Sequence, residues 1–418
     1  MLRVLHTSDW HLGHTLHELD RWREHDVFLD WLMALLGQEQ IDVLLLTGDV
    51  FDSANPSAQA SGRWFGFLAA LRRRYPSLDV IVIGGNHDSA ARLDAPRPIL
   101  TSMNIHILGG MPRGADGELD LAQLLIPVHD ATGAVAGWVA AVPFLRPGDL
   151  PRVKTEATTA EGRLVTGMRA LYQQVLVQLR ACRRPGQAAI MTGHCLMAGA
   201  ILSESSERKI QGGNQDALPT DVFPEELTYV ALGHLHLPQS VGRETVRYAG
   251  APLALSMAEG QYPHQVRILE IEDGQVVAQR SHRAPQVVPF IRLPDGDPAS
   301  IEDVLSLIGD LPDRTGDEEE ETLPFLEVRV SLDQPVPGLR RQVQEAVSDK
   351  AARLVKLTAQ FLGDGDALAD TLSMERLRDI LPEEVFVRRY QRDHEGDPPP
   401  ALLASFHELL NAVLEEGA

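Results

Sequence analysis

Five short clusters of Asp, Asn and His residues in this sequence contain the residue types that bind metal ions. The clusters are Asp9-Trp10-His11, Gly48-Asp49, Gly85-Asn86-His87-Asp88, Gly193-His194 and Gly233-His234-Leu235-His236. Each follows an apolar run typical of a buried strand, at residues 2–5, 43–46, 80–83, 189–191 and 228–232. Ligands of an open α/β sheet bind at the carboxyl ends of its strands. We therefore expect the five clusters to converge on one metal centre.

The ligand types restrict the metal that this centre would bind. Carboxylate oxygen and imidazole nitrogen together suit Mn, Fe, Zn or Mg, and the number of imidazoles argues against a site designed for Mg²⁺ alone. One Asp can bridge two cations, and Asp49 is the best placed to do so. The expected first set is Asp9, His11, Asp49 and His236, and the expected second set is Asp49, Asn86, His194 and His234.

Such a pair of sites indicates phosphodiester chemistry. Two metal ions about 3.5–4 Å apart can clamp a phosphodiester, activate water and stabilise both oxygens of an in-line displacement. His87 stays outside both sets, so we expect it to protonate the leaving oxygen or to stabilise charge. Asp88 follows it and is expected to orient the His87 ring. A Ser-His-Asp hydrolase is the competing enzyme, but the sequence has no Gly-x-Ser-x-Gly elbow.

The first 110 residues alternate strand and helix patterns, which predicts a layered α/β domain. One helix is expected over residues 20–38, where apolar residues share one face. A second is expected to open at Asn55-Pro56, as N-cap and first helical residue, and to end near Arg74. We interpret its aromatic residues Trp64, Phe65 and Phe67 as core contacts, with a helix–helix dimer contact as the alternative.

The pattern changes after residue 120. Hairpins are expected over residues 121–142 and 266–281, with a loop at 145–162 and a helix at 163–182 between them. The second hairpin would close the first domain.

A second domain is expected from Ala284-Pro285. Its pattern alternates strands with helices, at residues 287–293, 301–308, 325–332, 338–347 and 353–359, and this predicts a small α+β domain. From residue 373 two helical segments follow, separated by residues 396–400, and the last has an apolar stripe suited to a partner protein.

The composition restricts the class of protein. The chain of 418 residues has only two cysteines, Cys182 and Cys195, which suits a reducing cytosol. It has no apolar run of membrane-spanning length, and its N-terminus enters a strand directly, so no membrane or secretion role is expected.

A net charge of −21 argues against coating nucleic acid by charge alone, but bound cations reverse the local field and leave a nuclease possible. Without a P-loop, any ATP would be bound by another chain.

The five clusters resemble the five signatures of the calcineurin-like metallophosphoesterases. Longer strings resemble a narrower group, the SbcD nuclease subunits of bacterial SbcCD complexes, which are related to the Mre nucleases. These strings are Thr7-Ser8-Asp9-Trp10-His11-Leu12-Gly13, Gly48-Asp49-Val50-Phe51-Asp52, Tyr248-Ala249-Gly250-Ala251-Pro252-Leu253 and Leu381-Pro382-Glu383-Glu384-Val385-Phe386. The resemblance therefore covers nearly the whole chain. Some relatives carry a His where Asp52 stands, and a carboxylate cannot replace that cationic group.

The resemblance implies an α/β/β/α sandwich nuclease domain over residues 1–283, a DNA-facing capping domain over 284–372 and C-terminal helices over 373–418. It implies two divalent metal ions, Mn²⁺ first with Mg²⁺ as the alternative, held by the seven ligand residues above, with His87 and Asp88 as catalytic residues. The implied activity is 3′→5′ exonuclease action on double-stranded ends and endonuclease action on single strands and hairpins, in DNA repair and recombination.

The implied partners are an SbcC-type ABC ATPase, which would bind residues 373–418, and a second copy of the chain through helices that include residues 56–74. The implied location is the cytoplasm, at the nucleoid. Two alternatives stay open at this point: a calcineurin-like phosphatase or cyclic-nucleotide phosphodiesterase, and a non-catalytic scaffold that recruits an ATPase.

Overall fold

A computed structural model describes residues 1–151, 160–202, 217–334 and 336–361, together with residues 390, 398, 399 and 402. It divides into two compact units. The first comprises Met1–Phe290 and Glu319–Thr322, and the described part of the second comprises Ile291–Glu318 and residues 323–361. The helices expected over residues 373–418 lie outside the described residues, apart from the four single positions.

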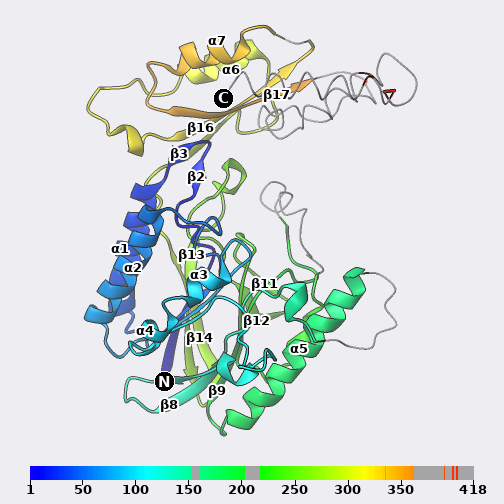
Figure 1. Cartoon of the computed structure of the whole chain (residues 1–418). Coiled ribbons are helices and arrows are strands. Elements are labelled where there is room, and N and C mark those ends of the chain that lie inside the picture. The colour runs from blue at the N-terminus through cyan, green and yellow to red at the C-terminus, as the bar shows by residue number, and fades with distance from the viewer. Residues whose placement is uncertain are drawn as a thin grey trace. The chain divides into compact units, whose positions relative to one another are not determined.

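The first unit contains two six-stranded sheets (Figure 1). The first sheet has the order β14 (Gln275–Arg283), β13 (Gln265–Glu272), β1 (Leu2–Thr7), β4 (Val43–Thr47), β5 (Asp79–Ile83), β6 (Ile105–Leu108). Its four strands from β1 to β6 are parallel, and the hairpin β13–β14 adds to β1 in the antiparallel sense. The predicted C-terminal hairpin therefore closes the first unit by pairing with the N-terminal strand.

The second sheet has the order β11 (Gln239–Val241), β12 (Arg243–Tyr248), β10 (Tyr229–Gly233), β9 (Ala188–His194), β8 (Val135–Ala140), β7 (Leu125–His129). Its four strands from β12 to β8 are parallel, and β7 and β11 are antiparallel edges. Both sheets thus contain a parallel centre, whose carboxyl ends can carry a site.

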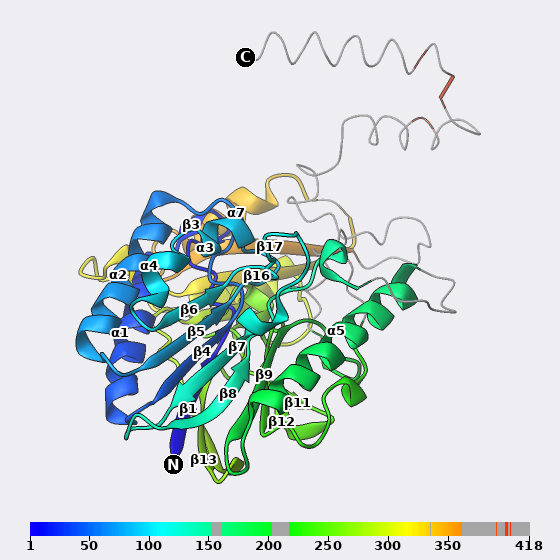
Figure 2. The same ribbon diagram turned by 60° about the horizontal axis from the view of Figure 1, so that its bottom comes forward.

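Apolar residues bury both faces of each sheet and define four layers. Helices α1 (Trp22–Gln38) and α2 (Ala58–Arg74) place Phe28, Leu32 and Leu68 against Leu44 and Val80 of the first sheet. Other residues of that sheet form one core with the second sheet and with α5 (Ala160–Cys182): Val4, Leu45, Ile81, Ile190, Val230, Leu171 and Val175. Figure 2 shows α1 and α2 on the outer side of the first sheet and α5 on the outer side of the second. The expected α/β/β/α sandwich is confirmed.

The element bounds differ from the predictions at a few places. Residues 121–124 form a 3₁₀ turn before β7, and α5 begins at Ala160, three residues earlier than expected. Two short helices, α3 (Ala90–Asp94) and α4 (Arg97–Thr101), had no distinct periodic pattern in the sequence. The prediction that Asn55 caps α2 is wrong, because the Ser57 hydroxyl accepts a hydrogen bond from the Ala60 N–H and the helix starts at Ala58.

The second unit is a three-stranded sheet with two helices. It contains β15 (Phe290–Leu293), α6 (Ile301–Gly309), β16 (Phe325–Leu332), α7 (Leu339–Val347) and β17 (Arg353–Phe361), in the order predicted from the sequence. Alternate residues of β16, Leu326, Val328 and Val330, pack with Val304 of α6 and Val343 of α7. Across both units, none of the helices in the described part of the chain combines the length and apolarity needed to cross a bilayer.

The cap of α2 yields a stability prediction. Ser57→Ala should lower the free energy of unfolding by about 1 kcal/mol, because it leaves a helix-terminal N–H without its side-chain acceptor. Asn55→Ala is the matched control and should leave stability within about 0.5 kcal/mol of wild type, since Asn55 is exposed and outside the helix. Denaturant unfolding followed by far-UV circular dichroism measures both variants, and a larger loss for Asn55→Ala would restore the original prediction.

Candidate metal centre

The strand ends that carry the five clusters meet where the two sheets face each other. Asp9 and His11 follow β1, Asp49 follows β4, and Asn86 and His87 follow β5 in the first sheet. His194 ends β9, and His234 follows β10 in the second sheet, and β4 lies against both strands. Two backbone hydrogen bonds tie the first two clusters together, from Asp9 N–H to Gly48 O (3.0 Å) and from His11 N–H to Asp49 O (3.0 Å).

Unusual backbone conformations aim several of these side chains. Asp9, His11, Asp49 and His234 all have positive φ, at 53°, 45°, 48° and 105°. Non-glycine residues adopt this region rarely, and such residues cluster at functional sites. Gly85 is required for its small size and not for its backbone conformation, because a Cβ there would collide with the carboxylate and backbone of Asp49. The chain thus accepts local strain to bring these loops into contact.

Asp9, His11 and His236 form the first potential metal site. Their ligand atoms lie within 4.8 Å of one another. The Asp9 carboxylate also accepts a hydrogen bond from the His234 N–H (3.0 Å). The Nε2 atom of His11 is buried and has no hydrogen-bond partner among the described residues. An unpartnered imidazole nitrogen beside two buried carboxylates fits a bound cation.

The Asp49 carboxylate lies between the two expected ligand sets. Its Oδ2 is 3.5 Å from His11 Nε2 and 3.3 Å from His194 Nε2, while its Oδ1 accepts a hydrogen bond from the His87 N–H (2.9 Å). One oxygen therefore faces one imidazole from each set. This is the geometry that a bridging carboxylate requires.

The second potential site gathers around Asn86. Its Oδ1 is 2.8 Å from His194 Nε2 and 3.1 Å from His234 Nδ1. The His194 ring places its Nδ1 2.9 Å from the carbonyl oxygen of Thr47. Because a carbonyl oxygen only accepts, Nδ1 carries a proton, and Nε2 is the ring nitrogen that faces the centre and that a cation would bind in place of a proton. The structure thus brings all seven predicted ligand residues to one centre.

Burial and mutual charge shift the acidities in this centre. Burial lowers the pKa of His194 and His236, but Asp49 and Glu259 outweigh it and raise each to about 9. Burial, aided by the neighbouring His194, lowers the pKa of His234 to about 3. Burial opposes ionisation of Asp49, yet the His194 and His11 imidazoles hold its pKa well below its usual range. The Asp49 carboxylate therefore stays anionic, as a ligand of divalent cations needs to be.

The structure separates His87 from Asp88, which sequence analysis had paired. His87 turns its Nδ1 to the Asp52 carbonyl oxygen (2.8 Å). Asp88 accepts hydrogen bonds from three backbone N–H groups, those of Val50, Phe51 and Gly85. The prediction that Asp88 orients the His87 ring is wrong, because its carboxylate is occupied in joining the loops after β4 and β5. Burial and the nearby Asp49 charge raise the pKa of Asp88 to about 6.

Two further carboxylates touch the centre and were missed as site residues. Asp52 Oδ1 is 3.1 Å from His11 Nδ1 and 3.0 Å from His14 Nδ1. Glu259 is fully buried and places Oε1 3.3 Å from His236 Nδ1. Asp52 stands three residues after Asp49, so the sequence contained a local signal for it. Glu259 had none, because it lies 23 residues beyond His236 and the fold alone brings it back.

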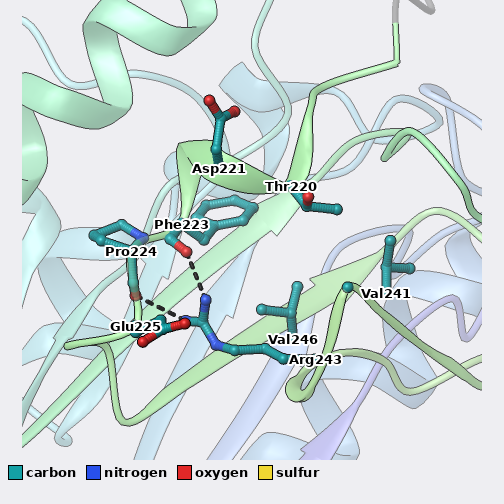
Figure 3. Close-up of a pocket in the computed structure, with 9 residues that line it drawn as sticks. Thr220, Asp221, Phe223, Pro224, Glu225, Val241, Arg243 and Val246 are labelled. Atoms are coloured by element: carbon teal, nitrogen blue, oxygen red, sulfur yellow. Dashed lines mark hydrogen bonds between the residues drawn. The ribbon is translucent and has the colours of Figure 1, made fainter.

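A pocket of about 370 Å³ lies elsewhere in the first unit, between β12 and the 3₁₀ turn Thr220–Val222 (Figure 3). The Arg243 guanidinium at its rim donates to the carbonyl oxygens of Phe223 (2.6 Å) and Pro224 (2.8 Å). Its charge is thus engaged by the protein, and we assign the pocket no role.

The three hydrogen bonds of Asp88 generate a prediction. Asp88→Asn should lower the free energy of unfolding by about 1–3 kcal/mol, because an amide group brings donors against backbone donors in a buried place. Chemical denaturation measures the loss. Unchanged stability together with a shifted pH–rate profile of phosphodiester cleavage would instead restore a role for Asp88 through His87.

Comparisons with known proteins agree with this geometry. Residues 2–238 match the family model described as calcineurin-like phosphoesterase. Residues 286–394 match the model described as type 5 capsule protein repressor C-terminal domain, SbcD_C.

Curated relatives cover most of the chain. The SbcD subunit of the SbcCD nuclease from Rhodobacter capsulatus is 39% identical over 85% of this chain and 87% of its own length. The protein of the same name from Escherichia coli K12 is 30% identical over 93% of this chain and 92% of its own, and that from Bacillus subtilis is 31% identical over 66% and 67%. The chain belongs to the calcineurin-like phosphoesterase family and, within it, to the SbcD subunits of SbcCD nucleases.

Proposed function

We propose that this chain is a two-metal DNA nuclease that uses Mn²⁺. It would act as a 3′→5′ exonuclease on double-stranded ends and as an endonuclease on single strands and hairpins. Its family makes it a hydrolase of phosphodiester bonds. The observation that carries the proposal is the placement of Asp49 Oδ2 between His11 and His194, one imidazole from each ligand set. DNA repair and recombination, at the nucleoid in the cytoplasm, are the proposed setting.

Asp9, His11, Asp49 and His236 would hold the first cation, and Asp49, Asn86, His194 and His234 the second. Mixed oxygen and imidazole ligands suit Mn²⁺, and Mg²⁺ stays an alternative. When bound, the two cations would supply charge neutralisation on the phosphodiester and activation of the attacking water.

The part proposed for His87 is proton transfer to the leaving oxygen. Its backbone N–H binds Asp49 and its Nδ1 faces the Asp52 carbonyl oxygen, so the ring is held from two sides. The carbonyl oxygen accepts a hydrogen bond from Nδ1–H, which leaves Nε2 to exchange a proton with the substrate. The His11 ring stands 4.8 Å away, centroid to centroid, at a steep angle.

Differences in burial supply a direction of approach. Asp9, Asp49, His194 and His234 are buried, whereas Asn86, His87 and His236 are only half-buried. A phosphodiester would therefore reach the centre from the side of Asn86 and His87. Independently of that direction, we propose that the domain over residues 284–372 contacts the DNA, as the family resemblance implies.

The proposed partners follow from the family and from two segments. An SbcC-type ABC ATPase would bind residues 373–418. A second copy of the chain would dock through helices that include α2. On that helix Trp64 and Phe67 are buried in the chain's own core, while 43% of the Phe65 surface is exposed and available.

The first test is cleavage of an end-labelled linear duplex with Mn²⁺. The assay is run with the chain alone and, in a parallel set, with the ATPase partner added. Wild type should release nucleotides stepwise, and His87→Ala should lose at least 100-fold in rate, as expected for a proton-transfer group. Both proteins should bind the same number of Mn²⁺ ions, because His87 is not a ligand. His282→Ala on β14 is the matched control and should cleave like wild type.

Two results would contradict this proposal. Hydrolysis of small phosphodiesters without any cleavage of DNA would make the chain a phosphodiesterase. Loss of bound metal from His87→Ala would make that residue a ligand.

A second test removes residues 373–418. The truncated chain should keep its thermal unfolding transition and lose co-purification with the ATPase partner, because the proposed contact lies within that segment. Full-length protein in the same pull-down is the control. Retained co-purification would place the ATPase contact in residues 1–372.

A further inference from the structure

The segment from Tyr248 to His264 is distinctive in sequence, and the proposed nuclease mechanism does not use it. It follows β12 and contains the 3₁₀ turn Met257–Glu259. Its one acidic side chain, Glu259, has none of its surface exposed. A fully buried carboxylate needs partners that compensate for its charge.

The first partner of Glu259 is a predicted metal ligand. Glu259 Oε1 lies 3.3 Å from Nδ1 of His236. The carboxylate accepts, so Nδ1 donates, and Nε2 is the nitrogen on the other side of the ring, where a cation would take the place of a proton. Nε2 is then the atom available to a cation in the first site.

Several buried groups hold Glu259 in that position. Its Oε2 accepts from the Leu255 N–H (2.9 Å) and its Oε1 from the Ser256 hydroxyl (3.0 Å). The His264 ring bridges the carbonyl oxygens of Ala251 and Glu259, both at 2.9 Å. Arg21 adds a hydrogen bond to the Ala254 carbonyl oxygen. The whole segment is folded around the carboxylate that it presents to His236.

Asp52 does the same for the other imidazole of the first site. Its Oδ1 is 3.1 Å from His11 Nδ1, which leaves His11 Nε2 directed at the centre, where it lacks a partner among the described residues. Two carboxylates thus stand behind the two imidazoles of one site. Each adds a negative charge close to the cation.

The second site lacks this arrangement at its best-defined imidazole. His194 is backed by the carbonyl oxygen of Thr47, and the Asn86 ligand is a neutral amide. Among the inner carboxylates, Asp49 is assigned to both sites and Asp9 to the first, although Asp9 also lies within 4.8 Å of His194. The outer carboxylates Asp52 and Glu259 add to the difference in charge between the two sites.

We infer that Asp52 and Glu259 are positioning residues that make the site of His11 and His236 the tighter of the two metal sites. This inference rests on the proposed two-metal function. Carboxylates that accept from a ligand imidazole fix its tautomer and raise its basicity, and their removal costs about 10–100-fold in metal affinity. The second site, backed by neutral groups, would release its cation first when the metal concentration falls.

Calorimetric titration of the metal-free full-length chain with MnCl₂ tests the inference. Wild type should show two binding events of different affinity. His236→Asn should remove the tighter event and His194→Asn the weaker one, which assigns each event to its site. Glu259→Gln, and separately Asp52→Asn, should weaken the tighter event about 10–100-fold and leave the weaker event unchanged.

A matched control is the Asp79–His129 pair, another buried carboxylate bound to an imidazole (3.1 Å), at the amino end of β5 and away from the centre. Asp79→Asn should leave both events as in wild type. Should Glu259→Gln fail to fold, Asp52→Asn decides, because its side chain is 35% exposed and tolerates the change.

Each other outcome is informative. Equal loss from both events, loss confined to the weaker event, or no loss in either variant would overturn the inference while leaving the nuclease proposal intact. A single binding event with two Mn²⁺ per chain would likewise overturn the inference, whereas a single event with one Mn²⁺ per chain would contradict the two-metal proposal itself.

Discussion

The buried carboxylate of Asp49 is the interaction on which this molecule depends. It follows the central strand β4, has a positive φ, and is almost inaccessible to water. An isolated buried anion is costly, so the surrounding chain must compensate for it. The imidazoles of His11 and His194 both lie near its Oδ2, and the His87 N–H donates a hydrogen bond to its Oδ1. This compensation ties both sheets to one point, because His11 belongs to the first sheet and His194 ends a strand of the second.

The two-sheet architecture makes that compensation possible. Parallel strands carry their loops at the same end, so two facing sheets bring loops from β1, β4, β5, β9 and β10 together. The polar contact of His6 with Tyr229 OH (3.1 Å) and Thr47 Oγ1 (3.0 Å) joins the sheets just below these loops. Burial lowers the pKa of His6 to about 3, so this junction stays neutral and adds no charge to the centre. The positive charge that balances the carboxylates therefore has to come from within the centre itself.

Carboxylates around the proposed ligands hold the loops and imidazole rings of the centre in position. Asp88 joins the loops after β4 and β5 through three backbone amides, while Asp52 and Glu259 stand behind His11 and His236. None of these carboxylates would need to contact a bound cation to influence it, because each fixes the position or the tautomer of a group proposed to bind one. Their different positions in the sequence explain why one could be predicted from the sequence and the other could not. Asp52 lies close to Asp49 in sequence, whereas Glu259 reaches the centre only through the fold of the segment that carries it.

The sequence by itself determined the elements and the candidate ligands. Apolar runs of three to five residues, each followed by Asp, Asn or His, identified the strands and the seven proposed ligand residues, since both signals are local. The alternation in residues 287–359 predicted the second unit for the same reason, and its strands and helices appear in that order. Only the tertiary structure decided what depends on contacts between distant residues: that Ser57 caps α2, that Asp88 binds backbone amides and not His87, and that Glu259 supports His236. Hydrogen bonds of this kind are chosen by which groups burial brings together, and a linear pattern contains no record of that choice.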